Sequence, residues 1–144
     1  MKDVKIGILG FGTVGAGVVE GIRKNEELIS QRTSIRPVVT KIADLDIESD
    51  RGITIDEGIL TTDAFSVIDD PDIDVIVELV GGVTIAKDFV LRALRNGKPV
   101  VTANKALLAE YGEEIYRTAR ESEVGIYYEA AVGGGIPVLR SQRA

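Results

Sequence analysis

The stretch GILGFGTVGAGV, residues 7–18, decides the fold class. It continues a nearly unbroken apolar run at 4–9, which is typical of a strand buried on both faces of a sheet. Gly10, Gly12 and Gly15 then form G-x-G-x-x-G where helical spacing begins. Such glycines allow a tight turn, a close approach to a pyrophosphate and close helix packing. The stretch predicts a dinucleotide-binding turn with phosphates at the helix N-terminus, and a plain glycine-rich turn is the alternative.

The rest of the chain alternates between strand-like and helix-like segments. Strands are predicted at 4–9, 35–43, 74–80, 98–103 and 125–130, and helices at 13–28, 64–68, 85–94 and 105–122, the last with a break near Gly112. The polar residues 45–62 are expected to form a long connection. This alternation predicts βαβ units and an α/β, Rossmann-type fold, with a doubly wound, mostly parallel sheet and helices on both faces.

The composition limits the possible chemistry. The chain has no cysteine and no histidine, which excludes thiol and imidazole catalysis and leaves acid–base work to Lys, Asp, Glu or Tyr. The 17 basic and 23 acidic residues give a net charge of −6, which argues against nucleic acid or an anionic membrane surface as a partner. No apolar run approaches the roughly 20 residues that span a bilayer, and no signal-peptide cleavage site is present. We therefore expect a cytoplasmic protein.

Asp44 follows the second predicted strand, where dinucleotide-binding folds place an acid on the adenosine ribose. It lies 29 residues after Gly15, because the first helix and its connection are long. An acid there favours NAD, since it would repel the 2′-phosphate of NADP. Lys41 and Arg51 could assist a phosphate, so NADP stays open. The alternative is that Asp44 only caps a turn.

Two later strands also end in candidate site residues. ELVGG at 78–82 ends one strand with Gly81 and Gly82, which allow the backbone to approach a cofactor closely, and VTANKALLA at 101–109 places Lys105 at a helix start. Open α/β sheets bind ligands at these strand ends. A cation is electrostatically unfavourable at a helix N-terminus. Lys105 is therefore a candidate to hold a carboxylate or assist proton transfer at a carbonyl, with a solvated surface lysine as the alternative.

Four strings, in this order, resemble the N-terminal half of the homoserine dehydrogenase family: GFGTVG at 10–15, ELVGG, TANKALLA and YYEAAVGGGIPVLR at 127–140. The resemblance implies hydride transfer between NAD or NADP and homoserine or aspartate 4-semialdehyde, on the route to threonine and methionine. It also implies that Lys105 lies beside the nicotinamide and the substrate. The residues that it places on the dinucleotide are Gly10, Phe11, Gly12, Thr13, Val14 and Gly15.

The same resemblance assigns a sodium ion and a substrate contact to EAAVGGGIPV, residues 129–138. The ion would be held by Glu129 and by the backbone carbonyls of Val132, Gly134 and Ile136. A hard cation prefers oxygen ligands, and consecutive glycines let carbonyls converge. Glu129 would supply the charge balance of the ion or accept a hydrogen bond from the substrate amine. A plain crossover loop that leads into a helix is the alternative.

In the resembled family a substrate and dimerisation domain follows, with an Asp and a Lys credited with substrate binding and acid–base catalysis. Neither has a counterpart here, so residues 1–144 are expected to form one dinucleotide-binding domain with little turnover alone. The longer protein is expected to be a homo-oligomer that acts on a small-molecule substrate. Two other functions stay open: a stand-alone module that senses a dinucleotide without catalysis, and a dehydrogenase of another small amino or hydroxy acid.

Overall fold

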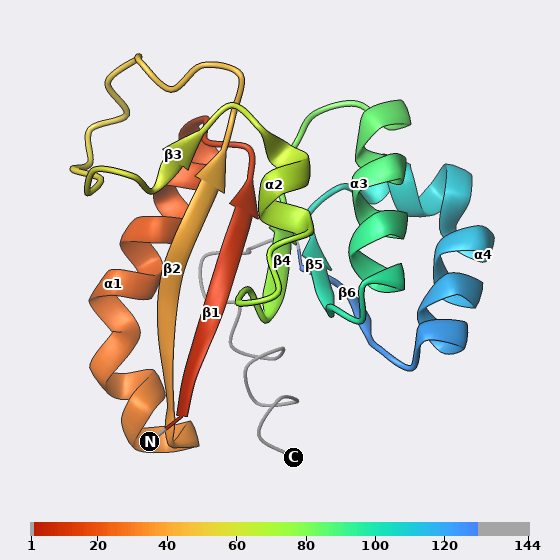
Figure 1. Ribbon diagram of the computed structural model, residues 1–144, viewed down its shortest axis with the longest axis horizontal. Helices are drawn as coiled ribbons and strands as arrows, with labels where there is room; N and C mark the ends of the chain where they lie inside the picture. The colour runs from red at the N-terminus through yellow and green to blue at the C-terminus, as the bar shows by residue number, and fades with distance from the viewer. Residues whose placement is uncertain (1, 130–144) are drawn as a thin grey trace.

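The structure is a computed structural model that describes residues 2–129. Six strands form one sheet in which every neighbouring pair is parallel, in the order β3-β2-β1-β4-β5-β6. This arrangement confirms the predicted α/β fold (Figure 1). The elements are β1 (Lys2–Leu9), α1 (Thr13–Thr33), β2 (Ile35–Ala43), β3 (Leu60–Thr61), α2 (Ala64–Ile68), β4 (Val75–Glu78), α3 (Thr84–Arg95), β5 (Val100–Thr102), α4 (Lys105–Ser122) and β6 (Ile126–Tyr128).

The chain changes direction within the sheet between β1 and β4. From β1 it moves outward through β2 and β3, and it then returns to the other side of β1 and moves outward through β4, β5 and β6. In Figure 1 the arrows of β1 and β2 point to the top of the view. Open α/β sheets bind ligands in the crevice beyond the strand ends at such a switch point. The top of the molecule, next to the ends of β1 and β4, is therefore where a ligand site is expected.

Helices cover both faces of the sheet, each over its own aliphatic cluster. On one face Val19 of α1 belongs to the same buried cluster as Ile8 of β1. On the other face α2, α3 and α4 pack together, with Leu94 of α3 in the same cluster as Ile76 of β4. All four side chains are fully buried, and each contributes about 1.5–3 kcal/mol of hydrophobic stabilisation. These two layers fix the position of the sheet between the helices.

The polar segment 45–62 was predicted as a connection, and this prediction was wrong at its end. Leu60 and Thr61 form β3, which pairs with Ile42 and Ala43 of β2. A strand of two residues is too short to show a hydrophobic period, so the sequence pattern carries no signal for it. The pairing matters for the site, because it places the start of α2 beside the end of β2.

Two helix predictions were also wrong in detail. α4 runs without a break through Gly112, which is buried, because packing of the helix outweighs the penalty of about 1 kcal/mol for an interior glycine. α1 continues beyond residue 28 because Ile29 is buried in the core, and it ends where Ser34 adopts a left-handed conformation with φ of 58°. No helix in residues 2–129 is long and apolar enough to cross a membrane.

Candidate dinucleotide-binding site

The loop between β1 and α1 requires glycine at two positions for different reasons. Gly10 has φ of +102°, and a Cβ atom there would lie 2.9 Å from the main chain of Leu79. A Cβ atom on Gly15 would fall on the carbonyl oxygen of Gly10, so glycine allows α1 to approach the loop closely. A Cβ atom on Gly12 would meet no described atom within 4 Å. The backbone at Gly12 is therefore open to a ligand.

The N-terminus of α1 has features that favour binding of an anion. Gly12 is its N-cap residue, and within the described chain no side chain caps the helix and no acid occupies its first turn. The first N–H groups of a helix have no hydrogen-bond partners inside the helix. The aligned peptide dipoles also give the N-terminus of the helix the equivalent of about half a positive charge. A phosphate at Gly12 would satisfy these groups.

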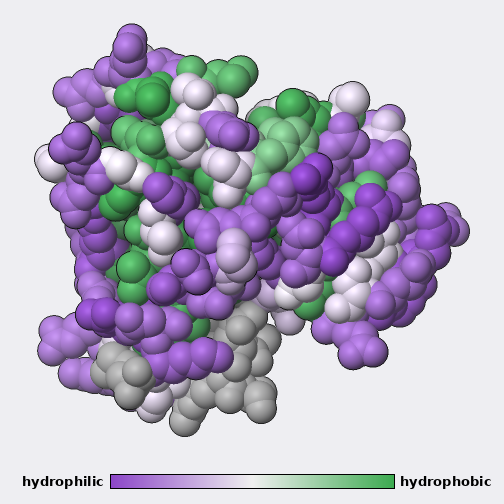
Figure 2. All heavy atoms as spheres, in the orientation of Figure 1, coloured by the Kyte–Doolittle hydropathy of each residue, from purple (hydrophilic) through white to green (hydrophobic). Residues whose placement is uncertain are grey.

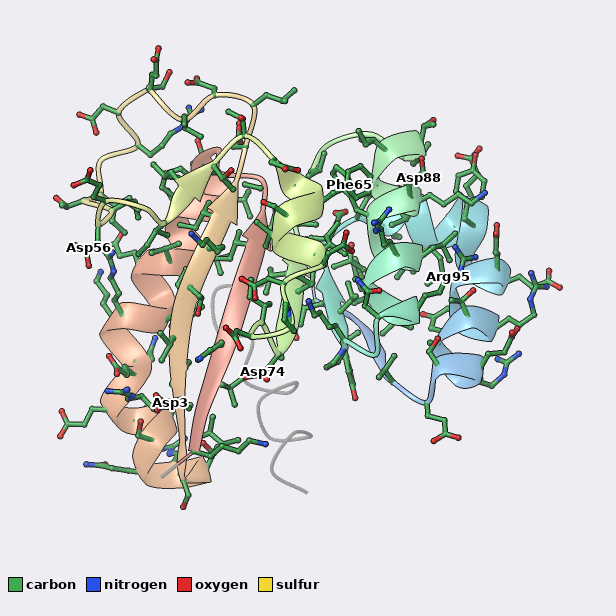
Figure 3. The ribbon with its side chains drawn as sticks, in the orientation of Figure 1. Asp3, Asp56, Phe65, Asp74, Asp88 and Arg95 are labelled. Carbon is green, nitrogen blue, oxygen red and sulfur yellow. The ribbon has the colours of Figure 1, made fainter. Side chains whose placement is uncertain are left out.

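A pocket of about 540 Å³ opens beside this loop and is mostly apolar. Gly12 and Asp44 line one side, and Leu45, Phe65 and Ile85 bring apolar surface to it. Leu45 is 92% exposed and Ile85 is 51% exposed, so both side chains are free to cover a ligand. Figure 3 shows Phe65 pointing from α2 toward α3. Figure 2 shows hydrophobic side chains gathered near the top of the view, at the end of the sheet to which β1 and β2 point.

Asp44 lies in this pocket and also stabilises its walls. One carboxylate oxygen accepts a hydrogen bond of 2.5 Å from the backbone N–H of Phe11, and the other accepts one of 2.8 Å from Asp46. Asp44 therefore does cap a turn, and it also ties the end of β2 to the glycine loop. Lys41 donates to the carbonyl of Gly58, whereas Arg51 forms an ion pair with Asp46.

A second pocket, of about 300 Å³, lies next to the first and shares Leu79, Val80 and Gly81 with it. Val14 and Lys105 also line it. The two pockets are therefore adjacent, and together they lie along the ends of β1, β2, β4 and β5. Lys105 is exposed and bonds to no other described residue. The residues of the predicted site that line these two pockets are Gly10, Gly12, Val14, Asp44, Gly81, Gly82 and Lys105. Their roles stay predictions.

Glu78 is a residue of this region that the sequence interpretation did not assign. Its side chain is fully buried at the end of β4, and the Thr102 hydroxyl donates to Oε1 over 3.5 Å. Oε2 has no hydrogen-bond partner in the described part of the chain. Burial raises the pKa of Glu78 from 4.5 to about 7, although Asn104, Val80 and Thr102 favour its ionised form. The available signal was an acid inside the apolar run DVIVELV at 74–80.

A larger pocket, of about 650 Å³, opens at the opposite end of the sheet beside Lys98, Glu123 and Tyr127. The Lys98 ammonium donates to the carbonyls of Ile68 and Asp70, each over 2.5 Å. These bonds complete the C-terminal end of α2, so the buried cation already has structural partners. The end of the sheet with the glycine loop is therefore the better candidate for a ligand site.

Comparison with known proteins identifies the family. The family model described as "Homoserine dehydrogenase, NAD binding domain" matches residues 10–129. The chain belongs to this family. It is 48% identical to the homoserine dehydrogenase of Pseudomonas aeruginosa over 99% of this chain and 32% of that protein, and 43% identical to that of Bacillus subtilis over 98% and 33%. The crystal structure of a homoserine dehydrogenase from Thiobacillus denitrificans matches with a TM-score of 0.84 and 42% identity, over 91% of this chain and 30% of that one.

The family match confirms the resemblance drawn from the four sequence strings. The chain spans about a third of the length of the curated homoserine dehydrogenases that it matches. The matched range ends at Glu129, which lies just after β6 and donates its backbone N–H to the carbonyl of Thr102 over 3.0 Å. Glu129 is thus placed at the same end of the sheet as Lys105.

The predicted sodium site cannot be compared with the structure as a whole. Val132, Gly134 and Ile136 lie outside the described residues. Within residues 2–129 no group of three or more acidic side chains is placed to hold a metal ion. The expected ligands were one carboxylate and three carbonyls, so the sodium assignment stays a prediction.

Proposed function

We propose that this chain is the cofactor-binding part of a homoserine dehydrogenase, which transfers hydride between a nicotinamide dinucleotide and homoserine or aspartate 4-semialdehyde. The observation that carries the proposal is the pair of adjacent pockets, one apolar and beside the glycine loop, the other lined by Lys105. The adenosine end would lie between Leu45, Phe65 and Ile85, with the pyrophosphate against Gly12 and the N-terminus of α1. The nicotinamide end would lie in the smaller pocket.

The residues present fit such a cofactor. The open backbone face at Gly12 and the uncapped start of α1 suit a pyrophosphate, and the larger pocket offers the apolar surface that an adenine ring needs. Phe11, Thr13 and Val14 are the other loop residues that we assign to the dinucleotide, with Gly81 and Gly82 on the opposite wall. When bound, the cofactor supplies the hydride, and the protein supplies binding and orientation.

Lys105 would act on the substrate from the start of α4. Its ammonium bonds to no other described residue and lines the smaller pocket. In that place it can hold the carboxylate of an amino-acid substrate or assist proton transfer at the reacting oxygen. We propose Glu129 as a second substrate contact, and as the carboxylate ligand of a sodium ion that the carbonyls of Val132, Gly134 and Ile136 would complete.

Asp44 is expected to make the chain prefer NAD. In calorimetric titrations of the folded chain, NAD should bind about tenfold more tightly than NADP, because the 2′-phosphate would face this carboxylate. Asp44→Asn should reduce the preference to about threefold or less, because it keeps one acceptor and removes the charge. Asp56→Asn, which changes an exposed acid away from this pocket, is the control. Tighter binding of NADP by the unchanged chain would show that the Asp44 argument is wrong.

The proposed role of Lys105 is tested by mutation in a longer protein, which contains this chain and the remaining part of a homoserine dehydrogenase. Lys105→Met should lower kcat/KM for homoserine about 30-fold, which corresponds to the loss of one charged hydrogen bond. The Kd for NAD should change by less than about threefold, because the dinucleotide is held mainly by the loop. Lys24→Met, at an exposed lysine of α1, is the control. Equal activity of the Lys105 and Lys24 variants would contradict the proposed role.

Assays of the same longer protein with a panel of substrates distinguish the alternative functions. Oxidation of another small amino or hydroxy acid in preference to homoserine would favour a related dehydrogenase. Cofactor binding without oxidation of any substrate in such a panel would favour a sensing module. The cytoplasmic location and the homo-oligomeric state expected from the sequence stay predictions.

A further inference from the structure

Glu78 occupies an environment that needs a physical explanation. Its carboxyl group is fully buried at the end of β4, and Thr102, its partner in the register between β4 and β5, donates to it over a long 3.5 Å. The other carboxyl oxygen has no partner among residues 2–129. A buried polar group with incomplete hydrogen bonding is unfavourable for the fold. An apolar side chain would avoid this penalty, so the carboxyl group is expected to have another use.

The contacts of Glu78 lead to the smaller pocket. The Thr102 hydroxyl also accepts a 3.0 Å hydrogen bond from the backbone N–H of Asn104. The Asn104 side chain donates to the carbonyl of Gly82 over 2.6 Å and accepts from the N–H of Leu107 over 2.9 Å. A chain of polar contacts therefore runs from Glu78 through Thr102 and Asn104 to Gly82.

This network joins the two loops that form the pocket. Gly82 belongs to the loop after β4, and Asn104 is the N-cap of α4, directly before Lys105. Both Gly82 and Asn104 line the pocket. Glu78 and Thr102 are fully buried and lie behind this wall. The spacing of the two loops, and the position of the first turn of α4, thus depend on groups that a ligand would not touch.

We propose that Glu78 is a positioning residue that holds Thr102 and Asn104 in place, and that it thereby sets the affinity of the smaller pocket for the nicotinamide half of the cofactor. The proposal rests on the proposed function for its ligand. The Thr102 hydroxyl donates to Glu78, and the same hydroxyl accepts the backbone N–H of Asn104. An apolar residue at position 78 would leave the Thr102 hydroxyl without this acceptor.

ADP-ribose provides the test, because it shares every part of NAD except the nicotinamide. Glu78→Met has a similar length but no oxygen acceptor, and it should weaken NAD binding about tenfold. Its affinity for ADP-ribose should stay within about threefold of the unchanged chain, since none of Glu78, Thr102, Asn104 and Gly82 lines the larger pocket. Glu78→Gln keeps an acceptor and should restore NAD binding to within about threefold. Glu113→Met, at an exposed acid of α4, is the control.

Three outcomes would overturn the proposal: equal losses for NAD and ADP-ribose in Glu78→Met, no loss for either ligand, or a Gln variant as weak as the Met variant. If Glu78→Met does not fold, Thr102→Val and Thr102→Ser test the contact between Glu78 and the Thr102 hydroxyl. Ser keeps this hydroxyl and Val does not. Only Thr102→Val should then lose NAD affinity selectively. Failure of the folded, unchanged chain to bind either ligand would overturn the proposed function itself, which separates the two failures.

Discussion

Gly15→Ala should lower the free energy of unfolding of the chain by about 3 kcal/mol or more, which is the upper range for overpacking. The new Cβ atom would fall on the carbonyl oxygen of Gly10. Both partners are backbone, so no side chain can rotate to relieve the clash. The N-terminal turn of α1 would have to move away from the loop after β1, and the core contacts of Ala16 and Val19 would be disturbed.

The same variant should weaken NAD binding about 100-fold, because the pyrophosphate needs the N–H groups of α1 in register with Gly12. Gly17→Ala is the matched control in the same helix. A Cβ atom on Gly17 would meet no described atom within 4 Å, so alanine should stabilise the chain by up to about 1 kcal/mol through its higher helix propensity. Urea unfolding followed by circular dichroism measures stability, and calorimetry measures binding. Equal behaviour of the Gly15 and Gly17 variants would contradict this interpretation of the loop.

The parts of the fold that were predicted correctly are determined by residues that are close together in the sequence. The starts of α1 at Thr13 and of α4 at Lys105 were predicted because glycine and Asn-Lys follow apolar strands at these points. The parallel sheet was predicted because strands covered by helices on both faces are apolar throughout. Asp44 lies in the larger pocket because a parallel sheet brings the carboxyl ends of its strands together, and its role on the ribose stays a prediction.

The parts that the sequence did not predict depend on contacts between distant segments. β3 exists because Ile42 and Asp44 donate backbone hydrogen bonds to the carbonyls of Ile59 and Thr61. The bond between Asp44 and Phe11 joins residues 33 positions apart. The run DVIVELV places an acid inside an apolar strand, but it does not indicate which neighbouring elements cover Glu78. Its burial follows from the packing of the β4 and β5 ends under α3 and α4, which no local pattern encodes.

The buried carboxyl of Glu78 should make stability depend on pH in the direction opposite to that of an ion-paired acid. Its pKa is about 7 in the folded chain, compared with an ordinary value of 4.5. Between these values the folded chain keeps a proton that the unfolded chain has lost, so stability falls as the pH rises through this window. The contribution is fully present below pH 4.5 and is lost by about pH 8. A shift of this size corresponds to about 3 kcal/mol.

Glu78→Gln removes the titration and keeps the shape of the side chain. Its free energy of unfolding should be close to that of the unchanged chain near pH 4.5 and about 3 kcal/mol higher at pH 8. Asp3, Asp46 and Asp69, whose pKa values are lowered by hydrogen bonds to Arg36, Ser49 and Arg92, are common to both proteins, so their effect cancels in the difference. Urea unfolding at constant ionic strength between pH 4.5 and pH 8 measures this difference, with Glu113→Gln as an exposed control.

A difference that does not change with pH would show that Glu78 ionises as an exposed acid does, which would contradict its burial. The rise expected at pH 8 would instead show that the chain keeps an acid where an amide gives a more stable fold. Acids with strongly perturbed pKa values cluster at functional sites, often at the expense of stability. Combined with a selective loss of nicotinamide affinity in Glu78→Met, that result would identify the network behind the pocket as the reason that the acid is retained.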